Sequence, residues 1–380
     1  MYTVPTMIQR KINIQEHLEP NKVLIIYGPR QVGKTTLVNE FLKITNLPYK
    51  FFTGDDLEFS KDFAQCDMGF IKKLLGNTQL LVVDEAHKIE NIGRALKLTV
   101  DTIPGIYVIS TGSSSFDLSN ATDEPLTGRK NVVHLYPLSL GEITSTFGEY
   151  EVGRTLNDYL IYGMYPNVIT YPTYDQKRNR ITEIANAYLI KDILEFDKVK
   201  KSKVVIDLLK LLAFQIGNEV STKELADNLG LDGKTVKRYL DLLEKSFVVM
   251  QLTGFSRNLR SEINKMSKYY FYDLGIRNAL IANFNSVDLR DDVGHLWENF
   301  AIMERIKANS YNKVYTNYYF WRTYEQKEID LVEERGGNLY GYEMKWSNEK
   351  IKAPEEWLTT YANASYEVIT SNNYQEFLLK

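Results

Sequence analysis

Short apolar runs alternate with stretches of helical periodicity over the first third of the chain. Residues 34–44 and 92–100 repeat apolar side chains at helical spacing. Four runs read as buried strands, namely residues 23–28, 80–83, 106–109 and 132–135. Strands that are apolar on both faces and alternate with helices predict an α/β fold with a parallel sheet covered on both sides.

The middle of the chain begins with a long helical stretch and continues with short helices and strands. Helical periodicity runs from about residue 156 to 196, broken by a turn at residues 163–166. Ser221 and Asp232 suit helix N-caps and Gly230 suits a C-cap. Three short helices and two strands are expected at residues 203–216, 222–229, 234–245, 247–252 and 269–272. Three helices followed by a two-stranded ribbon are the plan of a winged helix.

The last third again mixes helices and strands. Its amphipathic helix is expected at residues 297–306, and a second helix at 355–361. Strands are expected at residues 318–321, 328–332, 339–345 and 366–370. This order predicts a second α/β region.

Composition narrows the class of protein. Hydrophobic residues make up 44% and charged residues 25% of 380 positions, which is typical of two or three globular domains. The net charge of −3 means that any nucleic-acid contact depends on local basic patches. With Cys66 as the single cysteine, neither a disulfide nor a zinc cluster is expected. No apolar run suggests a membrane span and the N-terminus lacks a signal-peptide pattern, so a cytoplasmic protein without a membrane partner is expected.

The turn after the first predicted strand has the pattern of a phosphate loop, G-x-x-x-x-G-K-[ST]. Its glycines allow backbone N–H groups to point at a phosphate, and the following helix directs its positive end to the same place. Lys34 is expected to reach the β- and γ-phosphates of ATP, and the Thr35 hydroxyl to bind Mg²⁺. The predicted nucleotide-binding residues are Gly28, Pro29, Arg30, Gln31, Val32, Gly33, Lys34, Thr35 and Thr36.

Two carboxylates end the second predicted strand. Asp84 suits a Mg²⁺ ligand, and Glu85 suits the residue that polarises the attacking water. A solvated strand end is the alternative, but a phosphate loop about 50 residues earlier favours the catalytic interpretation.

Two further catalytic candidates follow the third strand. Thr111 and Ser113 lie where a polar residue would sense the γ-phosphate, and Ser113 is favoured; a loop of small residues is the alternative. Arg129 is a candidate arginine finger, acting either in cis or from a neighbouring subunit. The alternative is an ordinary surface arginine.

A series of motifs in a fixed order resembles a widespread prokaryotic family of AAA+ ATPases. Its members carry a C-terminal domain related in fold to PD-(D/E)XK nucleases. The resemblance rests on the phosphate loop and, in addition, on residues 83–89, 110–115, 126–129, 136–142, 159–166, 269–277 and 343–347. We see no second sensor arginine in the helical region, and the resemblance implies neither a ring nor any other oligomeric state.

The resemblance implies an ATPase domain, a winged helix and a nuclease-like domain, and the helical stretch of the sequence adds a fourth part. Residues 1–150 are expected to form the AAA+ P-loop ATPase domain and residues 151–200 a helical linker or lid. A winged helix is expected at residues 201–285 and a nuclease-like, restriction-endonuclease-type α/β domain at residues 286–380.

The predicted winged helix offers a DNA-binding surface. Its third helix, the one that enters the major groove in such folds, carries Lys234, Lys237 and Arg238. Arg257 and Arg260 at the ribbon are candidates to contact phosphates. A module that packs against protein is the alternative.

The last region carries the D…E-x-K pattern of PD-(D/E)XK nucleases. Glu343 and Lys345 share one face of a strand, Asp330 lies on the preceding strand, and Glu298 lies on an earlier helix. Asp330 and Glu343 are candidate ligands of a second Mg²⁺, and Lys345 would orient a water that attacks a phosphodiester. The alternative is a nuclease fold that has lost cleavage.

These observations lead to one hypothesis and its rivals. The favoured function is an ATP-hydrolysing protein that acts on DNA. The alternatives are a nucleotide-dependent switch that binds protein partners and a remodeller, each with an inactive nuclease-like fold.

Overall fold

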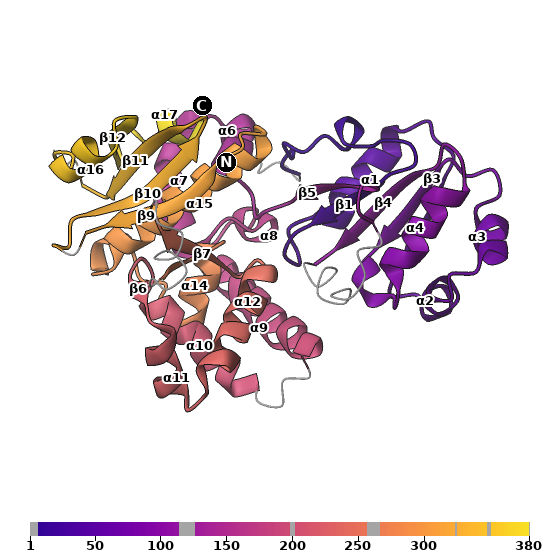
Figure 1. Cartoon of the computed structure of the whole chain (residues 1–380), viewed down its shortest axis with the longest axis horizontal. Helices are drawn as coiled ribbons and strands as arrows, with labels where there is room; N and C mark the ends of the chain where they lie inside the picture. The colour runs from indigo at the N-terminus through magenta and orange to yellow at the C-terminus, as the bar shows by residue number, and fades with distance from the viewer. Residues whose placement is uncertain are drawn as a thin grey trace. The chain divides into compact units, whose positions relative to one another are not determined.

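The computed structural model of the chain describes residues 7–113, 126–197, 202–256, 267–323, 325–347 and 351–379 (Figure 1). These residues form two compact units, which we describe separately. The N-terminal unit comprises residues 10–136 with residues 245–247. The C-terminal unit comprises the described residues before residue 10, residues 137–244 and the chain from residue 248 onward.

The N-terminal unit is built on a parallel five-stranded sheet with the order β2-β3-β4-β1-β5. Its strands are β1 (Val23–Tyr27), β2 (Tyr49–Thr53), β3 (Leu80–Asp84), β4 (Tyr107–Gly112) and β5 (Lys130–His134). Its helical segments are η1 (Ile14–Glu16), α1 (Lys34–Ile44), α2 (Leu57–Ala64), α3 (Met68–Leu75), η2 (Ala86–Lys88) and α4 (Ile92–Thr102). The predicted α/β class and the four predicted strands are confirmed.

The inner strands β1, β3 and β4 are buried on both faces, as their apolar sequences require. On one face, Ile25 and Leu81 join a core formed with α2, α3 and α4. On the other face, Leu24 and Ile26 are buried as well. Strand β2 was not predicted, because Tyr-Lys-Phe-Phe-Thr lies at the sheet edge and its first three side chains are exposed.

The C-terminal unit is built on one mixed seven-stranded sheet with the order β12-β11-β10-β9-β7-β8-β6. Its strands are β6 (Glu219–Val220), β7 (Val249–Gly254), β8 (Ser267–Phe271), β9 (Asn317–Arg322), β10 (Glu328–Arg335), β11 (Asn338–Lys345) and β12 (Ala364–Thr370). Strands β7 and β9 pair in parallel, with Thr253 opposite Tyr319. The sheet is therefore continuous across the boundary predicted between residues 285 and 286.

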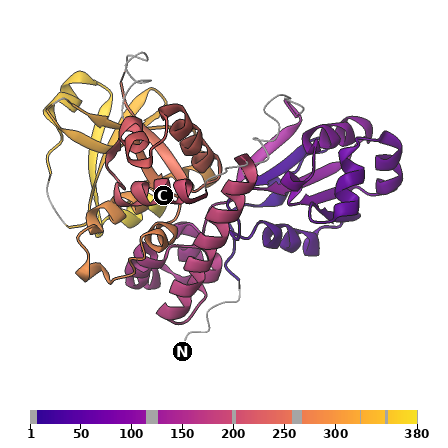
Figure 2. The same cartoon turned by 90° about the horizontal axis from the view of Figure 1, so that it is seen from below.

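Helices cover this sheet and lead into it. The 24-residue helix α9 is seen along its length in Figure 2, and α15 packs against β8 and β11. The remaining bounds are α6 (Leu140–Phe147), α7 (Glu149–Tyr162), α8 (Pro166–Ile169), α9 (Tyr174–Asp197), α10 (Ser202–Phe214), α11 (Thr222–Leu229), α12 (Gly233–Lys245), α14 (Leu274–Leu280), η3 (Val287–Leu289), α15 (Val293–Tyr311), α16 (Glu355–Thr360) and α17 (Tyr374–Leu379). None of the helices described has the length and apolarity that crossing a bilayer requires.

The predicted helix caps around α11 and α12 are present. The Ser221 hydroxyl accepts a hydrogen bond from the Glu224 N–H, and Gly230 ends α11 in the left-handed conformation. Asp232 accepts a hydrogen bond from the Thr235 N–H at 2.9 Å. These local signals explain why the bounds of both helices follow from the sequence.

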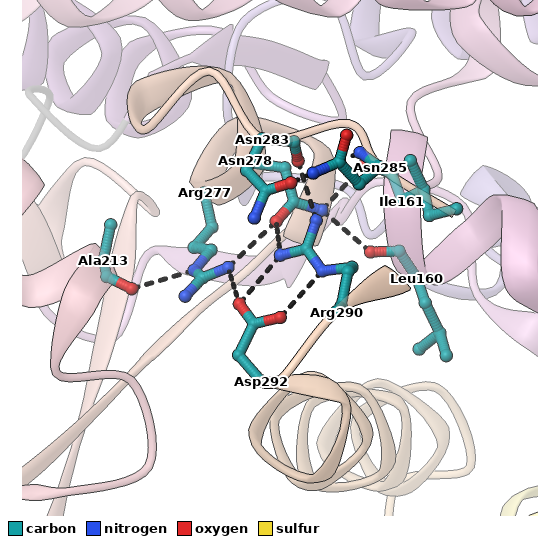
Figure 3. A network of polar contacts seen from close by, with 9 residues as sticks. All are labelled: Leu160, Ile161, Ala213, Arg277, Asn278, Asn283, Asn285, Arg290 and Asp292. Atoms are coloured by element: carbon teal, nitrogen blue, oxygen red, sulfur yellow. Dashed lines mark hydrogen bonds and ion pairs between the residues drawn. The ribbon is translucent and has the colours of Figure 1, made fainter. Parts of the chain in front are cut away.

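A buried polar network holds the start of α15 against α10 and α14 (Figure 3). Arg277 and Arg290 both contact the Asp292 carboxylate, at 2.6 and 2.7 Å. Arg277 also donates to the Ala213 carbonyl, and Arg290 to the Asn278 side chain. The side chains of Arg277 and Arg290 are 2% and 0% exposed, so Asp292 balances charge that water does not reach.

We predict that Asp292→Asn lowers the free energy of unfolding by about 3 kcal/mol, because it leaves two buried guanidinium groups without their carboxylate. Asp291→Asn, at an exposed neighbouring position, is the matched control and should change stability little. Urea unfolding of both variants measures the difference. Equal free energies of unfolding for the two variants would contradict the role of Asp292 as the counter-charge of the two arginines.

The same carboxylate has a pH signature. Burial alone raises the pKa of Asp292, but hydrogen bonds and charge from Arg290 and Arg277 outweigh it and lower the pKa to about 2. Its stabilisation is therefore complete above the ordinary aspartate pKa of about 4 and is lost as the pH falls toward about 2. The stability gap between wild type and Asp292→Asn should close over that range.

Candidate functional site

The predicted phosphate loop lies between β1 and α1, at the carboxyl edge of the parallel sheet. Strand β1 is an inner strand of the sheet, with β4 on one side and the edge strand β5 on the other. In open α/β sheets this edge, where neighbouring strands connect in opposite directions, is the usual position of a ligand site. The fold therefore presents the loop where a nucleotide would bind.

The conformation of the loop depends on its glycines and on close packing. Gln31 and Gly33 have φ values of 63° and 95°, in the left-handed region that helps a turn direct its N–H groups to one point. A Cβ atom at Gly28 would lie 2.0 Å from the Leu135 carbonyl oxygen. Any side chain at this position would push the loop away from the segment after β5.

Arg10 braces the loop from outside. Its guanidinium donates to the Val32 carbonyl at 3.0 Å and to the Tyr136 carbonyl at 2.6 Å. One side chain thus ties the loop to the chain that leaves β5. Nothing in the sequence pattern pointed to Arg10, because its partners lie 22 and 126 residues away.

The Lys34 ammonium folds back over the loop. It donates to the carbonyl oxygens of Gly28 and Pro29, each at 2.9 Å, and Lys34 is 5% exposed. A phosphate oxygen makes a stronger, charge-assisted partner for an ammonium than a neutral carbonyl does. Lys34 is therefore held in reach of an anion that enters the loop.

The other predicted loop residues divide into packed and accessible ones. Val32 is fully buried, and Thr36 and Gln31 are exposed, while Arg30 is half-buried. The buried valine anchors the turn, and the accessible side chains leave the outer surface of the loop open.

Asp84 connects the loop to two neighbouring strands. Its Oδ2 accepts a hydrogen bond from the Thr35 hydroxyl at 2.8 Å, and its Oδ1 accepts one from the Thr111 hydroxyl at 2.5 Å. The carboxylate is 7% exposed. Thr35 and Asp84, predicted 49 positions apart as partners in Mg²⁺ binding, are thus in direct contact.

Glu85 turns the chain out of β3. Its φ of 49° is left-handed, and its N–H donates to the Thr111 hydroxyl at 3.1 Å. The Thr111 hydroxyl thereby holds the Asp84 carboxylate, to which it donates, and the backbone of Glu85, from which it accepts. Ser113, the favoured sensor candidate, is buried one residue beyond the end of β4.

His87 was not among the predicted site residues, yet the structure places it beside Glu85. Its Nε2 lies 3.6 Å from Glu85 Oε2, and its side chain is 5% exposed. Burial lowers the pKa of His87 to about 4, and the charges of Lys34 and Arg30 act in the same direction. The imidazole is therefore neutral at pH 7, and the only sequence signal was its position two residues after Glu85.

Arg129 lies at the opposite edge of the sheet. Its carbonyl accepts from the Val23 N–H at the start of β1, and its half-exposed side chain pairs with Asp101 at 2.8 Å. The phosphate loop follows the other end of β1, five residues or roughly 15 Å away. The in-cis arginine finger does not fit this placement, and a role in a neighbouring subunit stays a prediction.

The four predicted nuclease residues come together in the C-terminal unit. Glu298 on α15, Asp330 on β10 and Glu343 on β11 interact electrostatically. The Lys345 ammonium lies 2.9 Å from Glu343 Oε1, and the Asp330 Oδ2 accepts a hydrogen bond from the Met344 N–H at 2.8 Å. Glu343 Oε2 is buried without a hydrogen-bond partner in the described structure.

Two residues of β8 enter this carboxylate cluster and were not predicted. The Lys268 ammonium lies 3.2 Å from Glu298 Oε1 and 3.8 Å from Asp330 Oδ1, and it also pairs with Glu328. The Tyr270 hydroxyl donates to Glu298 Oε1 at 2.6 Å. The only sequence signal for their role was the presence of a lysine, Lys268, in the otherwise uncharged strand β8.

The pKa values of Asp330 and Lys268 both reflect burial and neighbouring charges. Burial raises the pKa of Asp330 well above its usual range, and Glu298 and Glu343 add to the rise. Burial opposes the charge on Lys268, but Glu298 and Asp330 outweigh it and raise the lysine pKa. Lys268 is thus a cation held by carboxylates.

The structure does not support a divalent metal in this cluster. Among the described residues, no group of three or more histidine, cysteine, aspartate or glutamate side chains is arranged to hold a metal ion. An ammonium already faces Asp330, one of the two predicted ligands of the second Mg²⁺. The donor set fits an internal ion pair.

The predicted DNA-contacting side chains are accessible where they are described. Lys234, Lys237 and Arg238 are exposed on α12. Arg257 and Arg260 lie outside the described residues.

Three family models match consecutive parts of the chain. Residues 20–144 match an AAA domain. Residues 153–287 match a domain of unknown function (DUF8612), and residues 293–377 match another (DUF4143).

Similar proteins come from bacteria and archaea. An uncharacterized protein of Mycobacterium tuberculosis is 28% identical over 327 residues, 85% of this chain and 70% of the relative. An uncharacterized protein of Methanocaldococcus jannaschii is 24% identical over 393 residues, 97% of this chain and 86% of the relative.

Two solved structures show distant likenesses. One is a signal transduction ATPase with numerous domains and a tetratricopeptide repeat sensor from Pyrococcus horikoshii, with 13% identity, a TM-score of 0.30, and coverage of 82% of this chain and 49% of that one. The other is a DNA replication initiation factor, with 16% identity, a TM-score of 0.23, and coverage of 59% and 82%. At such low TM-scores neither bears on function. The family match and the loop geometry together support an AAA-type, nucleotide-binding ATPase domain over residues 20–144 of this chain.

Proposed function

We propose that the N-terminal unit binds ATP and hydrolyses it. The observation that carries the proposal is the 2.8 Å hydrogen bond between Thr35 and Asp84. It joins the hydroxyl that follows the phosphate-loop lysine to the carboxylate at the end of β3, an apolar strand separated from β1 by β4. This pairing of a loop hydroxyl with a strand aspartate is the arrangement that P-loop NTPases use around Mg²⁺.

The residues present fit such a cation. Thr35 and Asp84 offer oxygen ligands, which magnesium prefers, and Lys34 lies beside them for the phosphates. Mg²⁺ would supply charge neutralisation at the β- and γ-phosphates. The chain itself supplies the phosphate loop, the lysine and the Asp84 carboxylate, which two threonine hydroxyls hold in place.

Glu85 is the proposed residue that orients and activates water. It is one residue beyond Asp84, and its backbone is held by Thr111. The neighbouring His87 is neutral, because burial and nearby cations lower its pKa to about 4. A neutral imidazole leaves the carboxylate charge of Glu85 available to a water proton.

We further propose that this ATPase acts on DNA. The support is the plan of three helices, α10, α11 and α12, with the antiparallel strands β6, β8 and β7, which suits a winged helix. Exposed Lys234, Lys237 and Arg238 give α12 a basic surface for phosphates. Arg257 and Arg260 remain candidates outside the described residues.

The second candidate function is a nucleotide-dependent switch or remodeller that binds protein. The observation that favours it is Lys268 in the carboxylate cluster, because an internal cation suits a nuclease-like fold that has lost cleavage. DNA binding separates the two candidates. The nuclease activity expected of Glu298, Asp330, Glu343 and Lys345 stays a prediction and is not part of this proposal.

Two substitutions test ATP hydrolysis. Lys34→Ala should abolish nucleotide binding, whereas Glu85→Gln should keep binding but slow phosphate release by about 100-fold or more, because the water loses its base. Glu90→Gln, at an exposed carboxylate nearby, is the matched control. Phosphate release and fluorescent-nucleotide binding measure the two effects. Unchanged release in both site variants would sink the proposal.

A neighbouring pair of hydroxyls tests the role of Thr111. Thr111→Val keeps the shape but removes the hydrogen bonds to Asp84 and Glu85, so ATP turnover should fall by about tenfold, equivalent to about 1.4 kcal/mol. Ser110→Ala is the matched control, because the buried Ser110 hydroxyl has no hydrogen-bond partner in the described structure. Equal turnover in the two variants would remove Thr111 from the mechanism.

The salt dependence of DNA binding tests the basic surface of α12. Replacing Lys234, Lys237 and Arg238 by alanine should weaken binding and reduce the slope of log K against log salt by about 0.9 for each phosphate that these side chains neutralise. Lys223→Ala, at an exposed lysine on α11, should change little. Fluorescence anisotropy at several salt concentrations measures this. Absence of DNA binding by the wild type would favour the protein-binding switch.

A further inference from the structure

The carboxylates of the C-terminal unit converge from three separate elements. Glu298 comes from α15, Asp330 from β10 and Glu343 from β11, and each residue is less than 10% exposed. Carboxylates grouped out of water need a nearby positive charge, because their mutual repulsion is poorly screened there. The nature of that charge decides what the cluster does.

The positive charge at Glu298 and Asp330 is the Lys268 ammonium. Its side chain is 3% exposed, and its Nζ lies 3.2 Å from Glu298 Oε1 and 3.8 Å from Asp330 Oδ1. Its remaining close partner is Glu328, which also pairs with Arg322 at 3.7 Å. Three carboxylates from two elements thus surround one ammonium.

Sheet continuity brings Lys268 to this place. Lys268 lies on β8 opposite Leu252 of β7, and β7 pairs in parallel with β9. Its stem passes along the sheet so that Nζ lies 5.6 Å from the centre of the Phe320 ring on β9. From there the ammonium reaches the carboxylates of β10, the next strand.

Further donors engage the same carboxylates. Glu298 Oε1 accepts from both Lys268 and the Tyr270 hydroxyl, and Asp330 Oδ2 accepts from the Met344 N–H. A divalent cation in this position would have to displace these donors. It would also lie within a few ångströms of the ammonium, where two positive charges repel strongly in a buried setting.

We propose that Lys268 is a tethered cation that takes the place of a divalent metal in the carboxylate cluster. As folded here, the C-terminal unit does not take up Mg²⁺ or Mn²⁺ through Asp330. The cluster instead joins β8 to β10 and α15 as an internal ion-pair network. Cleavage of a phosphodiester by this cluster would first require withdrawal of Lys268.

The test is binding of Mn²⁺ to the whole chain without nucleotide, measured by the EPR signal of the Mn²⁺ that stays free. The wild type should show no Mn²⁺ binding that depends on Asp330. In Lys268→Met, which keeps an apolar stem without the charge, Mn²⁺ should bind at least about tenfold more tightly than in the wild type. The double variant Lys268→Met/Asp330→Asn should lose this gain. Lys352→Met, at an exposed lysine, should behave as the wild type does.

Thermal unfolding gives an independent readout. Lys268→Met should unfold at a lower temperature than the wild type because it leaves carboxylates uncompensated, and added Mn²⁺ should restore much of the loss. The wild type should not respond to Mn²⁺ in this way. A rescue specific to the variant shows the metal replacing the ammonium.

Two results would overturn the proposal. One is wild-type Mn²⁺ binding that weakens by about tenfold or more in Asp330→Asn, a comparison that does not require Lys268→Met to fold. The other is a folded Lys268→Met protein without any gain in Mn²⁺ affinity. Neither measurement depends on ATP turnover, so failure here is distinct from failure of the proposed ATPase.

Discussion

Charges removed from water must be matched within the protein, and this constraint organises both units. In the N-terminal unit, two threonine hydroxyls satisfy Asp84 at the end of β3. In the C-terminal unit, Asp292 balances two buried arginines, and Lys268 balances carboxylates from β10 and α15. Each of these groups has partners from other elements, so each site forms only when those elements are assembled.

The same constraint separates the chemistry of the two units. At the phosphate loop, Asp84 and Lys34 bond to neutral hydroxyl and carbonyl groups, which a nucleotide and its cation can replace at modest cost. In the carboxylate cluster, an ammonium of the chain already supplies the positive charge. The phosphate loop can therefore exchange its internal hydrogen bonds for a ligand, whereas the carboxylate cluster already has its counter-charge from Lys268.

The seven-stranded sheet is continuous, so the carboxylate cluster is physically linked to the predicted winged helix. Because β7 pairs with β9, strands expected in a winged helix and strands expected in a nuclease-like domain belong to one sheet. Lys268 lies on the first group of strands, Glu328 and Asp330 lie on the second, and Glu298 lies on α15. A movement of β8 would therefore act on the carboxylate cluster directly, through the ion pairs of Lys268.

The sequence by itself determined features that depend on neighbours within a few residues. The phosphate loop, the helix after it and the caps at Ser221, Gly230 and Asp232 follow from spacing, because turns and helix ends are stabilised locally. The sequence also predicted that Asp84 acts together with the phosphate loop, and in the structure the Thr35 hydroxyl donates a hydrogen bond to Asp84. Tertiary structure alone decided the edge strand β2, the bracing by Arg10, the position of His87 and the distance of Arg129 from the loop. It alone placed Lys268 among carboxylates at sequence separations of 30 residues and more, because such pairs depend on how strands align across a sheet and leave no periodic trace along the chain.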